Sequence, residues 1–226
     1  MLDGRWRAKA ERGLDPAGRA LHRLGVSADV LTVFGLVAAI GTAALIANGN
    51  LALAVIGVIL SGLPDLLDGS VARHSGTAGA RGAFLDSVCD RVADSVLLAG
   101  VAWHLTSESA GAPVLALGVL ALSLLVSYER AKAEALGFTA RGGMMERFER
   151  LVLLGVGLAF DILVPVLWIM LVLTAITAVH RFVKVWRQAS PTERPAFSGR
   201  MRTRFVRSHR ARRIRPRRVS RVPRRR

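Results

Sequence analysis

The chain has 226 residues, of which 52% are apolar and 21% are charged, and its formal net charge is +16. The charge is segregated, because residues 191–226 contain 15 Arg and one acidic residue, Glu193, and so carry +14. The rest of the chain carries only about +2 and holds nearly all the long apolar runs. This pattern argues against a soluble nucleic-acid-binding domain and against a disordered protein. A single Cys excludes an internal disulfide framework and a Cys-based zinc site.

The apolar runs have the length of membrane-spanning helices. A bilayer core requires about 20 apolar helical residues, and the chain contains three uncharged runs of 17 or 18 residues. Backbone groups in lipid must be satisfied within the segment, so we expect α-helices rather than strands. The sequence therefore predicts an all-α integral membrane protein with six transmembrane helices, over residues 30–47, 51–67, 82–105, 112–128, 144–160 and 162–179.

Basic residues predict the orientation of these helices. Lys and Arg are concentrated near both ends of the chain and in the connections that follow the second and fourth helices, whereas the other connections contain none. By the positive-inside rule, the basic connections and both termini face the cytoplasm. We therefore expect a multi-pass protein of the plasma membrane with both termini in the cytoplasm.

Three regions are expected along the chain. Residues 1–27 form a cytoplasmic juxtamembrane segment, in which Asp15-Pro16 is a helix-start signal before an amphipathic stripe that lies on the membrane surface. Residues 28–187 form the six-helix domain. Residues 188–226 form an Arg-rich, disordered cytoplasmic tail, which we expect to lie along anionic lipids rather than to bind a specific nucleic acid.

Four carboxylates occur where the second predicted helix ends and the third begins. Asp65 and Asp68 are three residues apart and Asp86 and Asp90 are four apart, so each pair shares a helix face. A carboxylate inside a membrane costs about 2.5–3.5 kcal/mol on insertion scales, and four of them close together repel one another. Such a cluster requires cations. Hard oxygen ligands in two pairs predict Mg²⁺ or Mn²⁺, with two ions expected.

These residues belong to the pattern D-x-x-D-G-x-x-A-R, eight residues, G-x-x-x-D-x-x-x-D, which resembles the signature of the CDP-alcohol phosphatidyltransferases. All eight fixed positions are matched, by Asp65, Asp68, Gly69, Ala72, Arg73, Gly82, Asp86 and Asp90. The resemblance implies a six-helix enzyme, usually a homodimer, with a cytoplasm-facing cavity. It also implies transfer of a phosphatidyl group from CDP-diacylglycerol to an alcohol, with release of CMP.

The same resemblance implies a role for each matched residue. Asp65, Asp68, Asp86 and Asp90 are expected to hold the metal ions, and Asp90 is also expected to be the general base that accepts the proton of the attacking hydroxyl. The expected contacts to the CDP-lipid are Asp29, Thr32, Gly69, Ala72, Arg73 and Gly82.

Basic segments on the predicted cytoplasmic side indicate the acceptor. Residues 127–135, 142–150 and 180–181 resemble segments of actinobacterial phosphatidylinositol-phosphate synthases, although Phe148 replaces a Pro and His180 replaces a Gln. That resemblance implies inositol phosphate as the acceptor and phosphatidylinositol phosphate as the product. The expected contacts to the acceptor phosphate are Arg130, Arg147, Arg150 and Arg181.

Other interpretations stay open. Within the family, glycerol 3-phosphate or another alcohol could be the acceptor, since the catalytic pattern does not identify it. Each of the basic residues could instead be a positive-inside anchor that binds lipid headgroups. Outside the family, the acidic cluster could belong to a cation-pathway transporter, or the protein could be a membrane scaffold. A transporter would more often contain internal repeats and charges near the bilayer midplane, which the sequence does not show.

Overall fold

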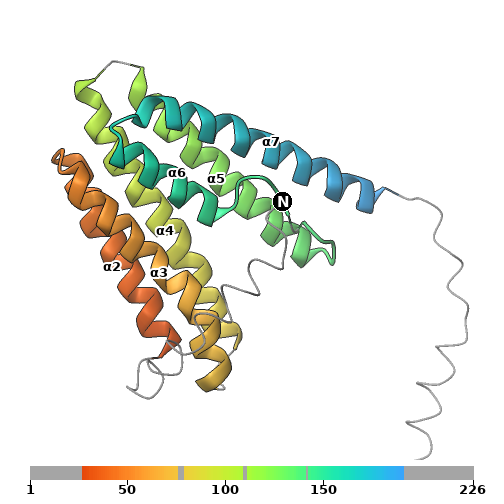
Figure 1. Ribbon diagram of the computed structural model, residues 1–226. Helices are drawn as coiled ribbons and strands as arrows, with labels where there is room; N and C mark the ends of the chain where they lie inside the picture. The colour runs from red at the N-terminus through yellow and green to blue at the C-terminus, as the bar shows by residue number, and fades with distance from the viewer. Residues whose placement is uncertain (1–26, 76–78, 109–110, 141, 191–226) are drawn as a thin grey trace, which may run out of the picture. The chain divides into compact units, whose positions relative to one another are not determined.

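The computed structural model describes residues 27–75, 79–108, 111–140 and 142–190, and for residues 65–75 it describes only the backbone. The described chain is helical and contains no strand. Its helices are α2 (Ala28–Ala47), α3 (Leu51–Ser75), α4 (Ala80–His104), the short 3-10 helix η1 (Leu105–Ser107), α5 (Ala112–Ala135), α6 (Arg147–Ala159) and α7 (Leu163–Ala189), as Figure 1 shows. The amphipathic helix predicted in residues 1–27 and the tail from residue 191 onward lie outside the described residues.

Each of the six apolar runs coincides with a helix. Among the described helices, α2, α5 and α7 are long and apolar enough to cross a membrane, and α3 contains a shorter apolar segment over Leu51–Pro64. Many large apolar side chains of these helices are exposed, including Val37, Ile59 and Trp168. Extensive exposed apolar surface indicates contact with something other than water. With the length and hydropathy of the helices, it identifies an all-helical membrane protein.

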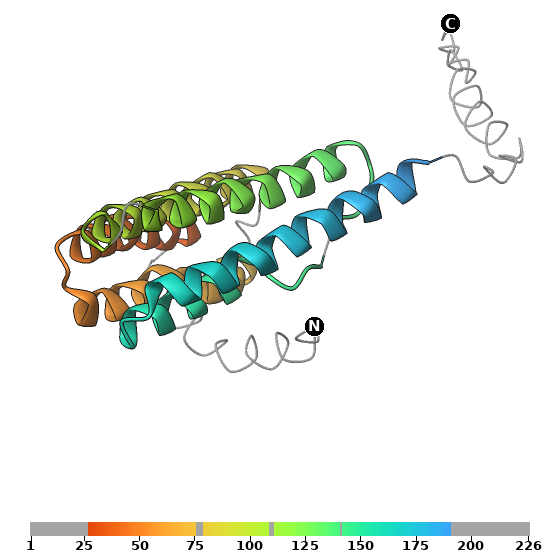
Figure 2. The same cartoon turned by 90° about the horizontal axis from the view of Figure 1, so that it is seen from above.

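The described helices pack in two layers. One layer contains α5, α4 and α2 in that order, and the other contains α3, α6 and α7, as Figure 2 shows. Contacts of α2 with α3 and of α5 with α7 join the layers along their two edges. The middle helices α4 and α6 therefore face each other across the interior.

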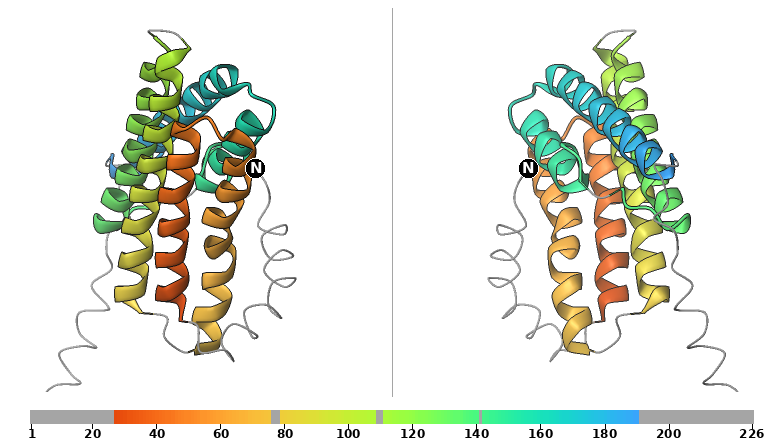
Figure 3. Two further views of the ribbon diagram at one scale, coloured as in Figure 1. Left: turned by 90° about the vertical axis from the view of Figure 1, so that its left-hand side faces the viewer. Right: turned by 90° about the vertical axis from the view of Figure 1, so that its right-hand side faces the viewer.

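The helix ends that carry the predicted acidic pattern lie together. Figure 3 shows the start of α2 between the end of α3 and the start of α4, and α2 packs against both. The start of α2 is fixed by its N-cap Ser27, whose Oγ accepts a hydrogen bond from the backbone N–H of Val30 at 3.3 Å. A serine in this position satisfies one of the unpaired N–H groups of the first helical turn.

Helix α6 begins three residues later than the sequence predicts and has only 13 residues. Its start is set by a capping box, in which the side chain of Glu149 accepts a hydrogen bond from the backbone N–H of Glu146 at 3.1 Å. At 1.5 Å per residue the helix is about 20 Å long, whereas the hydrocarbon core of a bilayer is about 30 Å thick. Three of the six predicted spans thus meet the length and hydropathy of a membrane helix, and the full set stays a prediction.

Small residues allow α2 to approach its neighbours closely. A Cβ added to Gly100 of α4 would lie 2.6 Å from the carbonyl oxygen of Ala43 in α2, and one added to Gly57 of α3 would lie 2.1 Å from Oγ1 of Thr42. Helices in lipid associate through such close packing, because lipid chains are as apolar as the side chains. The position of α4 beside α2 therefore depends on Gly100.

Replacing Gly100 with alanine should separate α4 from α2, because the added methyl group meets backbone atoms that cannot rotate away. Overpacking of this kind costs about 1–3 kcal/mol, so the midpoint of thermal unfolding in detergent should fall. Gly41→Ala on α2 is the matched control, since nothing lies within 4 Å of a Cβ at that position. Equal midpoints for the two variants would contradict the packing argument.

Candidate active site

A pocket lies at the starts of α2 and α4, beside the last described side chains of α3 and the first turn of α6. Its lining residues are Thr32, Gly35, Leu36, Ser61, Pro64, Asp86, Cys89, Asp90, Ala93 and Arg147. Two predicted metal ligands, one predicted CDP-lipid contact and one predicted acceptor contact therefore share a single pocket. The residues that line the pocket come from four helices, α2, α3, α4 and α6.

Two further residues of the predicted CDP-lipid site lie next to each other. A Cβ added to Gly82, near the start of α4, would lie 3.4 Å from Oδ1 of Asp29 in the first turn of α2. The glycine therefore leaves the Asp29 carboxylate close to the α4 backbone. Thr32 lies one turn along α2, where its Oγ1 donates a hydrogen bond to the carbonyl of Ala28 at 3.1 Å. The structure thus brings Asp29, Thr32 and Gly82 to the same helix ends.

The acidic residues of α3 lie at the edge of what the structure describes. Asp65 and Asp68 are in the last turns of α3, but the described side chains end at Pro64, which lines the pocket with Asp86 and Asp90. Among the residues whose side chains are described, no three or more His, Cys, Asp or Glu form a metal-binding group. The donors that are described are carboxylate oxygens, which Mg²⁺ and Mn²⁺ prefer. The last turns of α3 also contain the predicted CDP-lipid contacts Gly69, Ala72 and Arg73. Only the backbone is described there.

Asp90, the predicted general base, is in contact with Arg147, a predicted acceptor contact from α6. The guanidinium Nη1 of Arg147 lies 2.6 Å from Oδ1 of Asp90, and Nη1 of Arg91 lies 3.6 Å from Oδ2. The side chain of Asp90 is 21% exposed and that of Arg147 is 14% exposed, so the pair is largely shielded from solvent. The structure therefore places a cation suited to a phosphate directly beside the predicted base.

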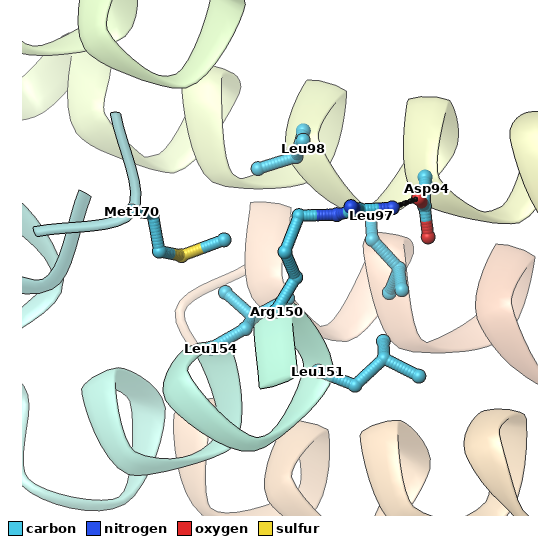
Figure 4. Close-up of a pocket in the computed structure, with 7 residues that line it drawn as sticks. All are labelled: Asp94, Leu97, Leu98, Arg150, Leu151, Leu154 and Met170. Carbon is cyan, nitrogen blue, oxygen red and sulfur yellow. Dashed lines mark hydrogen bonds and ion pairs between the residues drawn. The ribbon is translucent and has the colours of Figure 1, made fainter. Parts of the chain in front are cut away.

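Asp94 is a further charged residue at this site, one turn beyond Asp90 on α4. Its Oδ1 accepts a hydrogen bond from Nε of Arg147 at 3.3 Å, and its Oδ2 accepts one from Nη2 of Arg150 at 2.5 Å. Figure 4 shows Arg150 reaching from α6 to Asp94. The sequence prediction did not include Asp94 among the site residues, although its spacing from Asp90 places it on the same helix face. Two aspartates of α4 and two arginines of α6 thus form one network of ion pairs, the Asp–Arg network.

Arg181, another predicted acceptor contact, is buried and holds the loop that precedes α6. Its Nε donates a hydrogen bond to the carbonyl of Gly142 and its Nη1 donates one to the carbonyl of Val126, each at 3.0 Å. Its Nη2 lies 3.4 Å from Oε1 of Glu146, the residue that caps α6. Arg181, on α7, therefore ties together the C-terminal half of α5 and the start of α6, which carries Arg147 and Arg150.

The same loop is fixed by Thr177, one turn earlier on α7. The Oγ1 atom of Thr177 accepts hydrogen bonds from the backbone N–H groups of Met144 and Met145 at 3.3 and 3.2 Å. A Cβ added to Gly143 would lie 2.4 Å from Cγ2 of Thr177, so the loop can pass this close to α7 only with a glycine. These contacts explain why residues 144–146 are not helical.

Arg130, the remaining predicted acceptor contact, has an exposed side chain. Its Nε lies 3.2 Å from Oε1 of Glu134, one turn further along α5. Arg130, Arg150 and the carboxylate of Glu129 all lie within electrostatic range of Arg181. The Oε2 atom of Glu129 is buried and has no hydrogen-bond partner in the described part of the chain. The structure therefore groups the predicted acceptor residues near the start of α6, with Arg130 at the exposed side.

Comparison with known proteins identifies the fold and the family. The family model of the CDP-alcohol phosphatidyltransferases matches residues 26–186. The phosphatidylinositol phosphate synthase of Mycobacterium tuberculosis (strain ATCC 25618 / H37Rv) is 34% identical over 205 residues, which cover 85% of this chain and 94% of the relative. A crystal structure of the M. tuberculosis phosphatidylinositol phosphate synthase with CDP-DAG bound is 32% identical and has a TM-score of 0.73, covering 82% of this chain and 100% of that one.

A second crystal structure of the M. tuberculosis enzyme, in complex with manganese and citrate, has a TM-score of 0.71 at 33% identity. It covers 80% of this chain and 92% of that one. The family uses divalent metals such as Mg²⁺ or Mn²⁺, which agrees with the carboxylate donors of α4. The family match extends over every described helix from α2 to α6 and most of α7. The chain is therefore a membrane enzyme that belongs to the CDP-alcohol phosphatidyltransferase family.

Proposed function

We propose that this enzyme transfers the phosphatidyl group of CDP-diacylglycerol to inositol phosphate, giving phosphatidylinositol phosphate and CMP. The observation that carries the proposal is the contact between Asp90 and Arg147, which joins a candidate base to a candidate phosphate ligand in one pocket. Relatives that are about one third identical over most of this chain bear the name phosphatidylinositol phosphate synthase. Glycerol 3-phosphate is the other acceptor to test, since it too presents a phosphate to the arginines.

In the proposed reaction a hydroxyl of the acceptor attacks the phosphorus of the phosphatidyl group, and the bond from that phosphorus to the oxygen of the departing CMP breaks. Asp90 accepts the proton of the attacking hydroxyl, because its carboxylate lines the pocket and can act as a general base. Arg147 pairs with the Asp90 carboxylate and is the proposed hydrogen-bond donor to the acceptor phosphate. Proximity of base and phosphate ligand orients the acceptor for attack.

We assign Asp65, Asp68, Asp86 and Asp90 to a site for two Mg²⁺ or Mn²⁺ ions. This assignment is supported by the shared pocket of Asp86 and Asp90, by the carboxylate chemistry of the set and by the manganese in the M. tuberculosis structure. When bound, such ions neutralise the charge of a diphosphate and of a departing phosphate group. The residues proposed to surround the cytidine and the diphosphate are Asp29, Thr32, Gly69, Ala72, Arg73 and Gly82.

We further propose that all six helices contribute to crossing the membrane, with the pocket and both termini on the cytoplasmic side. The proposal is supported by the basic residues near the starts of α2 and α6 and beyond the end of α7. We also propose a homodimer, by resemblance to the family, and three regions over residues 1–27, 28–187 and 188–226. The last of these is proposed as a lipid-contacting Arg-rich tail.

The acceptor can be identified by measuring CMP release from CDP-diacylglycerol in detergent with Mg²⁺. We expect release with inositol phosphate to exceed release with free inositol or serine, because only a phosphorylated acceptor engages the arginines. We also expect it to exceed release with glycerol 3-phosphate, because the relatives bear the name phosphatidylinositol phosphate synthase. Preference for glycerol 3-phosphate would replace the proposed acceptor. No release with any of the four would argue for a scaffold or a transporter instead.

Asp90→Asn should lower turnover by roughly 10²- to 10⁴-fold, the usual contribution of a positioned general base. The amide keeps the shape of the side chain but cannot accept the hydroxyl proton. Asp161→Asn is the control, because Asp161 is an exposed carboxylate in the turn before α7 and lies outside the pocket. Full turnover by Asp90→Asn, with an unchanged midpoint of thermal unfolding, would remove Asp90 as the base.

Arg130→Ala should raise the KM for inositol phosphate roughly tenfold, the loss expected for one hydrogen bond to a charged group, and leave the KM for CDP-diacylglycerol unchanged. The side chain is exposed, so its truncation should not unfold the protein. Lys132→Ala is the matched control, because Lys132 is also exposed, carries the same charge and lies on the same helix. An equal effect of the two substitutions would mean that general surface charge, and not a specific contact, attracts the acceptor.

A further inference from the structure

Asp94 is a buried carboxylate to which the proposed reaction assigns no role. It lies on α4 and is only 9% exposed. A charged side chain at such a position in a membrane helix is costly, and those that occur are paired and mark functional sites. The partners of Asp94 therefore indicate what it does.

The carboxylate of Asp94 binds two arginines of α6. Its Oδ1 accepts from Nε of Arg147 and its Oδ2 accepts from Nη2 of Arg150. Both oxygens are used, and the two arginines are three residues apart, so they project from one face of α6. Because each oxygen of Asp94 binds a different arginine, this one carboxylate links both guanidiniums to α4.

The surroundings of Arg150 leave it few alternatives to Asp94. A pocket beside the ion pair is lined by Leu97 and Leu98 of α4, by Leu151 and Leu154 of α6 and by Met170 of α7, as Figure 4 shows. Four of these side chains are leucines, which cannot accept a hydrogen bond, and the thioether of Met170 is only a weak acceptor that cannot replace the carboxylate. The direction in which Arg150 points is thus set by Asp94.

Arg147 lies between two carboxylates. Its Nε binds Asp94 while its Nη1 binds Asp90. A phosphate that approaches Arg147 can take over the Nη1 side and release Asp90, while the bond from Nε to Asp94 keeps the guanidinium in place. Binding of the acceptor phosphate would then free the base at the moment when the hydroxyl arrives.

We propose that Asp94 is a positioning residue, which orients Arg147 and Arg150 for the phosphate of the acceptor without touching the substrate. The proposal rests on the proposed function, since it requires a phosphorylated acceptor. A purely stabilising role explains the geometry less well, because buried ion pairs contribute little net stability compared with apolar residues of similar volume.

The decisive variant is Asp94→Asn, which keeps the shape of the side chain but replaces one acceptor oxygen with a donor group. We expect the KM for inositol phosphate to rise at least roughly tenfold, as for loss of one hydrogen bond to a charged group. The KM for CDP-diacylglycerol should stay unchanged. The preference for inositol phosphate over free inositol should fall by a similar factor, because free inositol has no phosphate to bind.

Ser95→Ala is the matched control. Ser95 follows Asp94 on α4, but its Oγ donates to the backbone carbonyl of Arg91, on its own helix, and not to the arginines of α6. This variant should keep both KM values and the preference for the phosphorylated acceptor. The midpoint of thermal unfolding in detergent, measured for every variant, separates loss of fold from loss of acceptor recognition.

Asp94→Glu provides a second test of the positioning role, which can be used even if Asp94→Asn does not fold. Glutamate keeps the charge but displaces its oxygens by one methylene, so the KM for inositol phosphate should lie above that of the wild type. An unchanged acceptor KM in a folded variant, or an equal rise in the KM of both substrates, would overturn the positioning role. If the wild type shows no preference for a phosphorylated acceptor, the proposed function itself is wrong.

Discussion

Charge neutralisation between α4 and α6 is the constraint on which the rest of the structure depends. Two aspartates and two arginines meet inside a helical bundle whose outer surface is apolar, where water cannot solvate an unpaired charge. Removing one partner of such a network leaves a buried charge without compensation, which costs far more than the network contributes to stability. The network therefore fixes the distance and register of the two middle helices, and with them the positions of Asp90 and Arg147 in the pocket.

The pairing of these charges also limits what the pocket can bind. An incoming phosphate that engages Arg147 or Arg150 adds negative charge to a network in which two carboxylates already pair with these arginines. Cations at the acidic stretches of α3 and α4 would offset that charge, as carboxylate donors permit. A site of this kind binds anions and cations together more readily than either alone, which suits a reaction that joins a diphosphate-linked lipid to a phosphorylated alcohol.

The sequence predicts the helices well because uncharged runs of this length have few alternatives in a membrane. It predicts the start of α6 less well, because that start depends on the capping box of Glu146 and on hydrogen bonds from the loop to Thr177, more than 30 residues away. The sequence also does not predict the partners of Asp94, since Arg147 and Arg150 lie 53 and 56 residues further along the chain. Helical spacing indicates which residues share a face, but it does not indicate which helix that face meets.

The arginines show most clearly what the structure adds to the sequence. Taken singly, each basic residue on the predicted cytoplasmic side is compatible with an anchor that binds lipid headgroups. That interpretation suits Arg130, whose side chain is 45% exposed. It does not account for Arg150 and Arg181, which are buried and donate hydrogen bonds to a carboxylate and to backbone carbonyls inside the protein. Because burial of a guanidinium is costly unless ion pairs and hydrogen bonds compensate for it, these two arginines are better explained by the protein groups that they bind than by lipid headgroups.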